Sequence, residues 1–178
     1  AASLIRRKLE EPPSFIETSE VQLNIAPLKQ ALQFHWPSII RVAACALIAG
    51  ASYVFASFSV AFATNGYKLD KPTMLLVPVI ASAFALGITP LAGLVADKIG
   101  RKPTFLIGVF GAGIMTVPYL WSITTGNWTL IFVLGIICNG LFYSTANGVW
   151  PAFYAEMFPS RVRVSGLAVG TQIGFAIS

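Results

Sequence analysis

The chain has 178 residues, of which 56% are hydrophobic and only 11% charged, and its mean hydropathy is +0.73. One core of this size cannot bury so much apolar surface, so the composition excludes an ordinary soluble domain and indicates a chain solvated by lipid. Twelve Lys and Arg against seven Asp and Glu give a net charge of +5, but these cations lie between apolar runs, which is typical of membrane topology and not of nucleic-acid binding.

Residues 1–36 are the only stretch with the composition of a soluble segment. Cations at residues 6–8 are followed by tandem prolines at residues 12–13, so we predict a short basic helix that ends near Glu10. A second short helix is expected from about Pro27 to His35. The chain starts with Ala-Ala-Ser and its last apolar run stops at Ser178, which predicts a piece of a longer membrane protein.

Four apolar runs are long enough to cross a bilayer, since a spanning helix needs about 20 mainly apolar residues. They lie at residues 37–64, 72–92, 104–121 and 128–149, and an incomplete fifth run covers 165–178. Pro78 and Pro90 predict kinks in the second run. In the third run Gly108 and Ala112, four residues apart, favour close packing of a neighbouring helix; the alternative is a helix that only faces lipid.

The cations predict the orientation of these spans. One set of gaps holds most of them, namely Arg6, Arg7, Lys8, Lys29, Arg41, Lys98, Arg101, Lys102, Arg161 and Arg163. The gaps on the other side hold only Lys68 and Lys71. Because cytoplasmic loops carry the excess of Lys and Arg, we expect a multi-pass protein of the cell membrane with the N-terminus of this chain in the cytoplasm.

Residues 93–102, Gly-Leu-Val-Ala-Asp-Lys-Ile-Gly-Arg-Lys, join the second and third runs. Four charges among ten residues cannot lie in hydrocarbon, so we predict a short aqueous loop. Gly93 would allow a helix to approach closely and Gly100 would allow the positive φ of a tight turn. Asp97 would cap a helix or face its positive end.

This loop resembles the signature of the major facilitator superfamily, secondary transporters with twelve transmembrane helices in two similar halves. It matches Gly-x-x-x-Asp-(Arg/Lys)-x-Gly-(Arg/Lys)-(Arg/Lys) at every defined position: Gly93, Asp97, Lys98, Gly100, Arg101 and Lys102. In that family the motif follows the second helix of each half. The resemblance therefore implies an all-α membrane fold with helices seven to ten and the start of helix eleven. Residues 1–36 would be the cytoplasmic central-loop segment and 37–178 an incomplete C-terminal half.

Two further segments resemble particular branches of the family. Residues 151–166 are similar to the loop after helix ten in sugar porters and metabolite:proton symporters. Residues 6–15 resemble the segment after helix six in the symporters, with Pro12 where Thr or Ser is usual. The resemblance implies proton-coupled transport of a small organic acid or zwitterion by alternating access, together with an N-terminal half. A sugar or polyol porter, and a non-transporting sensor or scaffold, are the alternatives.

An enzyme is not expected. No Ser or Thr at membrane depth has a second titratable group to activate it, and the chain has no nucleotide-binding motif. Cys45 and Cys138 follow no metal-ligand or disulfide spacing, so we expect neither a metal nor a cofactor.

The charges that follow the second and fourth spans should meet on the cytoplasmic face. We expect Glu156 to be shared between Arg101 and Arg163, and the resemblance implies that these residues, with Arg161, act as a cytoplasmic gate. The alternative is that all are solvated charges that only obey the topology rule.

Polar residues on one helical stripe predict a solute cavity. Asn139, Tyr143, Asn147 and Trp150 are spaced four, four and three in the fourth span, and amides at membrane depth need partners or water. Interhelical hydrogen bonding is the alternative. Tyr53 and Ser57 begin a weaker stripe in the first span, where hydroxyls can return to their own backbone. No carboxylate lies within a complete span, so proton coupling is expected mainly in the other half.

Overall fold

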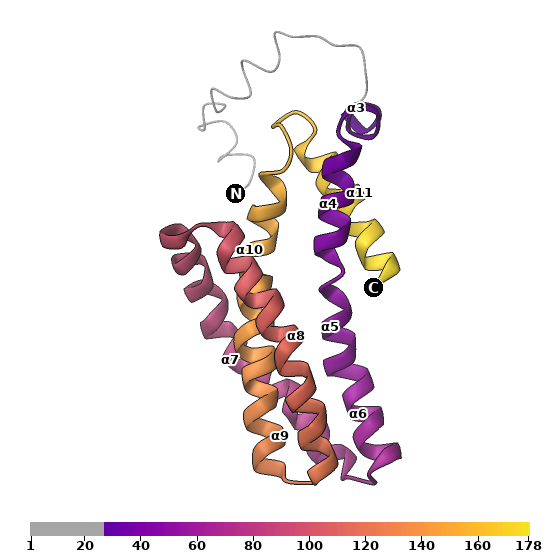
Figure 1. Cartoon of the computed structure of the whole chain (residues 1–178), viewed down its shortest axis with the longest axis vertical. Coiled ribbons are helices and arrows are strands. Elements are labelled where there is room, and N and C mark those ends of the chain that lie inside the picture. The colour runs from indigo at the N-terminus through magenta and orange to yellow at the C-terminus, as the bar shows by residue number, and fades with distance from the viewer. Residues whose placement is uncertain (1–26) are drawn as a thin grey trace, which may run out of the picture.

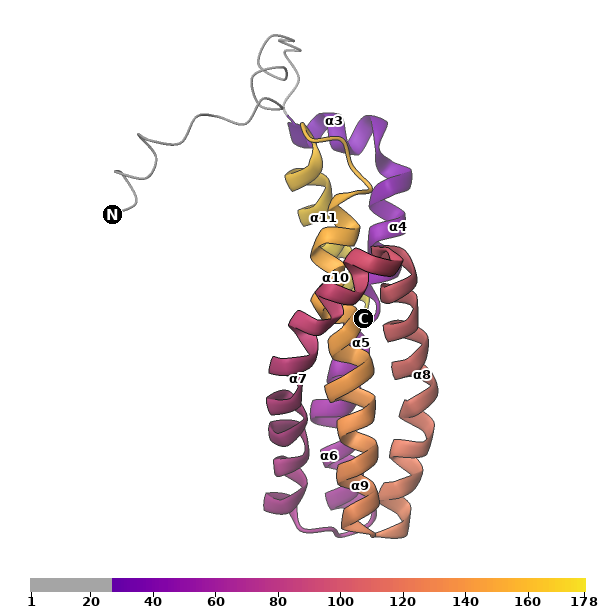
Figure 2. The ribbon, with the colours of Figure 1, turned by 90° about the vertical axis from the view of Figure 1, so that its left-hand side faces the viewer.

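The computed structural model describes residues 27–178, and every regular element in that range is helical. The short helix α3 (Pro27–Phe34) forms where the sequence predicts one. Figure 2 shows it lying across one end of a long bundle. The predicted basic helix that ends near Glu10 lies outside the described residues.

Within residues 27–178, four helices are long and apolar enough to cross a membrane: Trp36–Gly66, Lys71–Ile99, Arg101–Thr125 and Trp128–Ala155. The second is α7 (Lys71–Ile99) and the third is α8 (Arg101–Thr125). After the fourth, a turn leads to α11 (Arg163–Ile177). The predicted all-α membrane architecture is confirmed.

The spanning helices are longer than the apolar runs that predict them. Residues 93–99 are still helical and α8 starts at Arg101, so the expected charged loop is reduced to Gly100. The expected loop from residue 151 starts only after Ala155. Hydropathy identifies the part of a helix that lies in hydrocarbon, whereas the backbone hydrogen bonds of the helix continue into the headgroup region. Loops defined by hydropathy alone are therefore longer than the loops in the structure.

The first and fourth spanning helices contain π-helical turns. The first consists of α4 (Trp36–Ala46), α5 (Ala49–Tyr53), η1 (Val54–Phe58), α6 (Ser59–Ala61) and η2 (Phe62–Gly66). The fourth consists of α9 (Trp128–Gly135), η3 (Ile136–Tyr143) and α10 (Ser144–Ala155). Because π turns bond residue i to i+5, they are wider than α turns and rotate the side chains that follow them.

The fourth spanning helix is the centre of the bundle. It packs against both α7 and α8, while α11 packs beside α4 (Figure 1). Two main hydrophobic cores result. One joins Phe55 and Val60 of the first helix to α7, α8 and α9 at the end that carries residues 67–70. The other joins Val42 of α4 to α8, α10 and the turn before α11 at the opposite end.

Glycines bring the central helix close to its neighbours. A Cβ placed on Gly108 of α8 would lie 2.5 Å from the backbone nitrogen of Ala146, and one on Gly148 would lie 2.8 Å from the Thr89 carbonyl oxygen of α7. Such contacts are possible only where both backbones approach closely. Of the two interpretations of Gly108 and Ala112, close packing is therefore correct.

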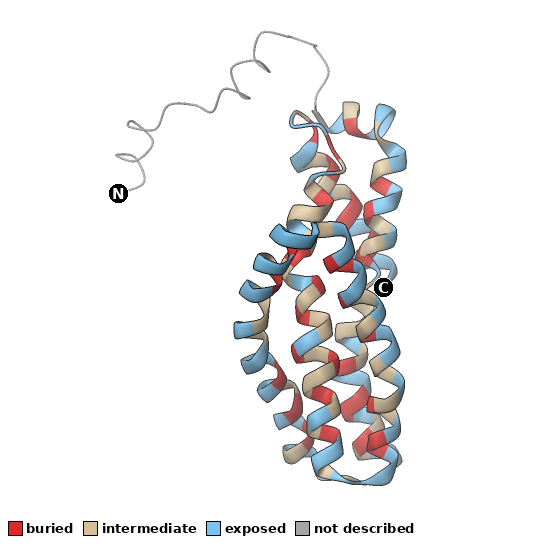
Figure 3. Cartoon of the chain, turned by 60° about the vertical axis from the view of Figure 1, so that its left-hand side comes forward, coloured by how far each residue is buried: buried red, intermediate tan, exposed pale blue. Residues whose placement is uncertain are grey.

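The outer surface of the bundle suits a lipid solvent. Figure 3 shows exposed residues along the outer sides of the helices and buried ones between them. Large apolar residues such as Leu86, Phe110 and Val117 are exposed there. The helix α7 keeps Pro78 and Pro90 inside it and is visibly bent (Figure 2).

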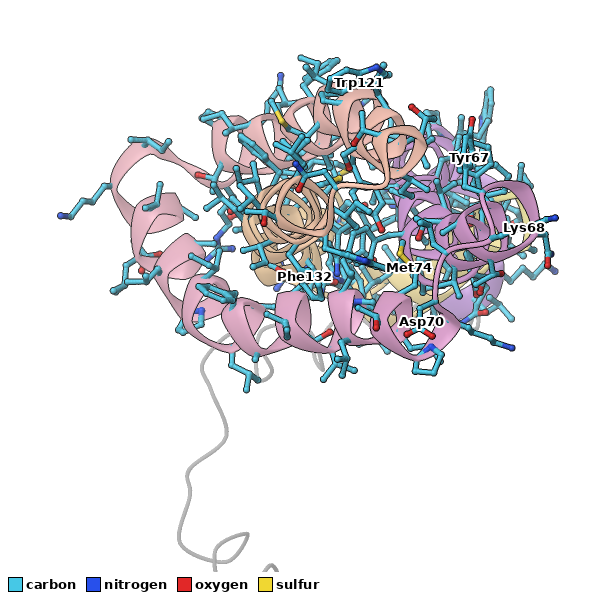
Figure 4. All side chains as sticks on the ribbon, turned by 90° about the horizontal axis from the view of Figure 1, so that it is seen from below. Tyr67, Lys68, Asp70, Met74, Trp121 and Phe132 are labelled. Carbon is cyan, nitrogen blue, oxygen red and sulfur yellow. The ribbon has the colours of Figure 1, made fainter. Side chains whose placement is uncertain are left out.

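The turn between η2 and α7 closes the end of the bundle opposite α3. Figure 4 looks onto this end, where Lys68 and Asp70 lie on the turn and Met74 lies in the buried core. Asp70 caps α7 by accepting hydrogen bonds from the Thr73 hydroxyl and, at 2.9 Å, from the Thr73 N–H. These bonds stabilise the carboxylate and lower the pKa of Asp70.

The close approach at Gly108 makes a stability prediction. Gly108→Ala should lower the unfolding free energy of the full-length protein by about 1–3 kcal/mol, because the new methyl group meets backbone atoms that cannot rotate away. Gly113→Ala on the same helix is the matched control, since nothing lies within 4 Å of its added Cβ and stability should stay the same or rise. Equal melting temperatures of the two variants in detergent would contradict the packing.

Candidate functional site

A cavity of about 90 Å³ lies between the first spanning helix, α10 and α11. Three of the predicted cavity residues, Tyr143, Asn147 and Trp150, line it. The remaining lining residues were not predicted: Ile48, Ala49, Ala146, Tyr154 and Phe175. The polar stripe of the fourth helix therefore faces other helices across a cavity.

The rotation of α10 directs these side chains. Gly148 lies against Thr89 and Val149 packs with Ala92 and Ala96, so this side of α10 is taken up by α7. With about 100° between successive residues, Tyr143, Asn147 and Trp150 fall on the other side. The packing of α10 on α7 thus determines which residues reach the cavity.

The cavity wall combines an amide with aromatic rings. The Trp150 indole Nε1–H donates to Asn147 Oδ1 at 3.0 Å. The Trp150 ring lies 5.4 Å from the Tyr154 ring and 6.4 Å, edge to face, from the Phe175 ring, as measured between centroids. Such a wall offers ring faces that attract cations and a few polar atoms that fix orientation.

Tyr154 is the functional candidate that the sequence analysis missed. Its side chain is 1% exposed, and its hydroxyl has no hydrogen-bond partner among the described residues. Buried polar groups are nearly always paired, so an unpaired hydroxyl beside a cavity needs an explanation. The signal was present in the sequence, because Tyr154 extends the stripe by four residues beyond Trp150.

Asn139, Tyr53 and Ser57 do not line this cavity. Asn139 lies within η3, and its backbone carbonyl accepts a bond from the Ser144 hydroxyl five residues later. The π turn rotates Asn139 away from the stripe that α-helical spacing predicts. Tyr53, the last residue of α5, and Ser57, within η1, are both exposed.

Hydroxyl groups in the first spanning helix mostly donate hydrogen bonds to backbone carbonyls of the same helix. This is the behaviour that made the stripe of Tyr53 and Ser57 the weaker cavity prediction. Ser52 Oγ donates to the Ala49 carbonyl at 2.7 Å, and the buried Ser59 donates to the Phe55 carbonyl. Ser59 Oγ also accepts from the buried Tyr119 hydroxyl of α8 at 3.1 Å. This bond is outside the cavity and ties two spanning helices together.

The charged turn between α7 and α8 meets the end of α10. Arg101 Nη1 lies 2.7 Å from Glu156 Oε1, which is one of the two predicted contacts. The second is not found: Arg163 Nε donates to the Phe158 carbonyl at 3.4 Å, because the turn after α10 folds back on itself there. Arg161 is half-buried in the same turn. Glu156 therefore pairs with Arg101 and is not shared with Arg163.

A shallow depression of about 130 Å³ adjoins this ion pair, lined by residues including Gly93, Asp97 and Arg101. Gly100 has the predicted positive φ, at 96°. Gly93 makes no close helix contact, since nothing described lies within 4 Å of its added Cβ. Asp97 does not cap α8, which has no side-chain cap, and Lys98 and Lys102 are exposed.

The side chains that most often bind metals are dispersed in the part of the chain that the structure describes. No three His, Cys, Asp or Glu side chains in the range 27–178 come together as a metal site would need. The two cysteines in this range, Cys45 and Cys138, are both free.

One family matches the whole chain, since the family model of the Major Facilitator Superfamily covers residues 1–178. A protein of Staphylococcus aureus strain COL, provisionally named a proline/betaine transporter, is 29% identical in an alignment 177 residues long that covers 97% of this chain and 38% of that protein. The glycine betaine/proline/ectoine/pipecolic acid transporter of Dickeya dadantii strain 3937 is 24% identical over 185 residues, covering 98% of this chain and 37% of that protein.

The proline/betaine transporter of Salmonella typhimurium strain LT2 is 22% identical over 185 residues, again covering 98% of this chain and 37% of that protein. The chain thus spans less than two fifths of the length of these relatives. No solved structure matches it.

Proposed function

Because the chain belongs to the Major Facilitator Superfamily, a family of transporters and not of enzymes, we propose that it is the larger part of the C-terminal half of a secondary transporter for a small zwitterion. The observation that carries this proposal is the cavity between α10, α11 and the first spanning helix. It leaves space for a solute beside the polar stripe of α10. The chain would supply helices seven to ten and the start of helix eleven.

The chemistry of the cavity supports a zwitterion. A cationic nitrogen is attracted to the faces of Trp and Tyr rings, and three aromatic residues besides Tyr154 line the cavity. The unpaired Tyr154 hydroxyl would donate to a carboxylate, after a small adjustment of the wall that brings the two together. The named substrates of the relatives, proline and betaine, carry both groups. A sugar offers neither charge.

Transport would proceed by alternating access, with an N-terminal half rocking against this one. The exposure of the Arg101–Glu156 ion pair favours a role of this pair in conformational change over a role in stabilising the fold. Its side chains are 41% and 56% exposed, and exposed ion pairs contribute only about 0–1 kcal/mol. A shift of about 1 kcal/mol nevertheless changes the ratio of two conformations roughly fivefold.

Proton coupling would depend on groups beyond this chain's spans. The carboxylates in residues 27–178 are Asp70, Asp97 and Glu156, and each lies at the end of a helix. The cations of α3, the charged turn and the turn after α10 belong to one side of the bundle, while Lys68 and Lys71 belong to the other. By the positive-inside rule, this distribution of cations supports a cytoplasmic position for the start of this chain in a cell-membrane protein.

Uptake by the full-length protein in proteoliposomes tests the function. With an imposed proton gradient, radiolabelled glycine betaine and proline should accumulate, whereas an organic acid and a hexose should not. Accumulation of the hexose alone would make the protein a sugar porter. No accumulation of any of the four by folded protein would favour a sensor or scaffold.

The Tyr154 hydroxyl should act in solute binding and not in folding. Tyr154→Phe should raise the KM for glycine betaine roughly tenfold or more, because a hydrogen bond to a charged group contributes about 1.5–3 kcal/mol. Its melting temperature without solute should stay the same or rise, since the removed hydroxyl is buried and unpaired.

Tyr119→Phe is the matched control for that variant. It removes a buried hydroxyl that is paired with Ser59 and lies outside the cavity, so it should lower the melting temperature and leave KM unchanged. A Tyr154→Phe protein with wild-type KM would exclude this hydroxyl from the binding site.

The ion pair should affect transport rate more than stability. Glu156→Gln keeps the shape and removes the charge, so we expect at least a fivefold lower uptake rate with the unfolding free energy changed by less than about 1 kcal/mol. The exchanged pair Arg101→Glu with Glu156→Arg should recover part of the rate. Loss of transport that the exchange does not relieve would mean that Glu156 acts through another partner.

A further inference from the structure

The short helix α3 lies across the end of the bundle instead of continuing its direction (Figure 2). Only His35 separates it from α4, which begins the first spanning helix at Trp36. Ala31 is fully buried and belongs to the hydrophobic core at this end, where α3 packs on α11. The side of α3 that carries Ala31 therefore faces down onto the bundle.

The apolar side chains of α3 extend beyond what the protein covers. At about 100° per residue, Leu28 and Leu32 lie to one side of Ala31 and Phe34 to the other, while Lys29 and Gln33 lie on the opposite face. Leu28, Leu32 and Phe34 are 49%, 50% and 66% exposed. The described residues thus leave about half or more of each of these three large apolar residues uncovered at the end of the bundle.

This exposed surface continues onto the membrane-spanning part of the chain. Trp36 and Ile40, in the first two turns of α4, are also exposed. They begin a helix that is long and apolar enough to cross a membrane, and Trp is enriched where hydrocarbon meets headgroups. The apolar face of α3 therefore lies level with the boundary between the bilayer and water.

We propose that α3 is an interfacial helix that lies in the plane of the membrane surface and binds anionic lipid. Leu28, Leu32 and Phe34 would enter the boundary of the acyl chains, as the apolar face of an in-plane amphipathic helix does. Lys29 on α3 and Arg41 on α4 are exposed cations at the same end. Arg41 would contact lipid phosphates, and Lys29, on the outer face of α3, would reach them through the length of its side chain. The helix fixes the depth at which α4 and α11 enter the bilayer.

Site-directed fluorescence tests this placement in the full-length protein. In a cysteine-free background, Leu28→Cys and its matched control Gln33→Cys are each labelled with the environment-sensitive dye NBD. The proteins are then reconstituted into phosphatidylethanolamine and phosphatidylglycerol vesicles, with or without lipid carrying a nitroxide near the headgroup. We expect blue-shifted emission and at least twofold quenching by the nitroxide at position 28, and neither effect at position 33.

Two results would overturn the proposal. Blue-shifted emission at position 28 without quenching would mean that another part of the protein covers the helix, and unshifted emission at both positions would mean that α3 projects into water. The headgroup contact has its own test. Replacing phosphatidylglycerol by phosphatidylcholine should weaken the quenching at position 28, and Lys29→Gln combined with Arg41→Gln should remove that dependence on lipid. Equal quenching in both lipids would exclude anionic lipid as the partner.

Discussion

The close approach of α7 and α8 to the helix of residues 128–155 is the contact on which the rest of the structure depends. Without side chains at Gly108 and Gly148, backbone meets backbone, and the central helix can hold only one rotation about its axis. That rotation directs Val149 toward α7 and sends Asn147 and Trp150 to the opposite side, where the cavity lies. Residues without any solute-binding chemistry thereby position the residues that we propose to bind solute.

The same packing gives the bundle two ends with separate hydrophobic cores. The first spanning helix is interrupted between Ala46 and Ala49, and its two parts join separate cores. The cavity lies at this interruption, since Ile48 and Ala49 form part of its wall. Under the proposed mechanism, the two parts of the helix could change their angle at this point while each core stays packed. The Arg101–Glu156 pair lies outside both cores, where exposure keeps it easy to break.

Sequence patterns predicted the helices, their number and the family, because lipid leaves few alternatives to apolar helices joined by charged turns. Within the site, α-helical spacing found Tyr143, Asn147 and Trp150, which lie close to or within regular α10. It failed for Asn139, because a π turn cannot be recognised from residue spacing. It also failed for the Arg163 contact, which depends on how the turn after α10 folds, and for Gly93, whose small size serves no contact in the described residues.

The central claim is that packing at the glycines turns one face of the fourth helix toward a water-accessible solute cavity and the other toward protein or lipid. Single cysteines at positions 147 and 141 in the full-length, otherwise cysteine-free protein measure this most directly. Asn147→Cys should react with a water-soluble thiol reagent, and glycine betaine should slow the reaction, whereas Leu141→Cys, on the exposed outer side, should stay unreactive. Reaction at position 141 with none at position 147 would contradict the account.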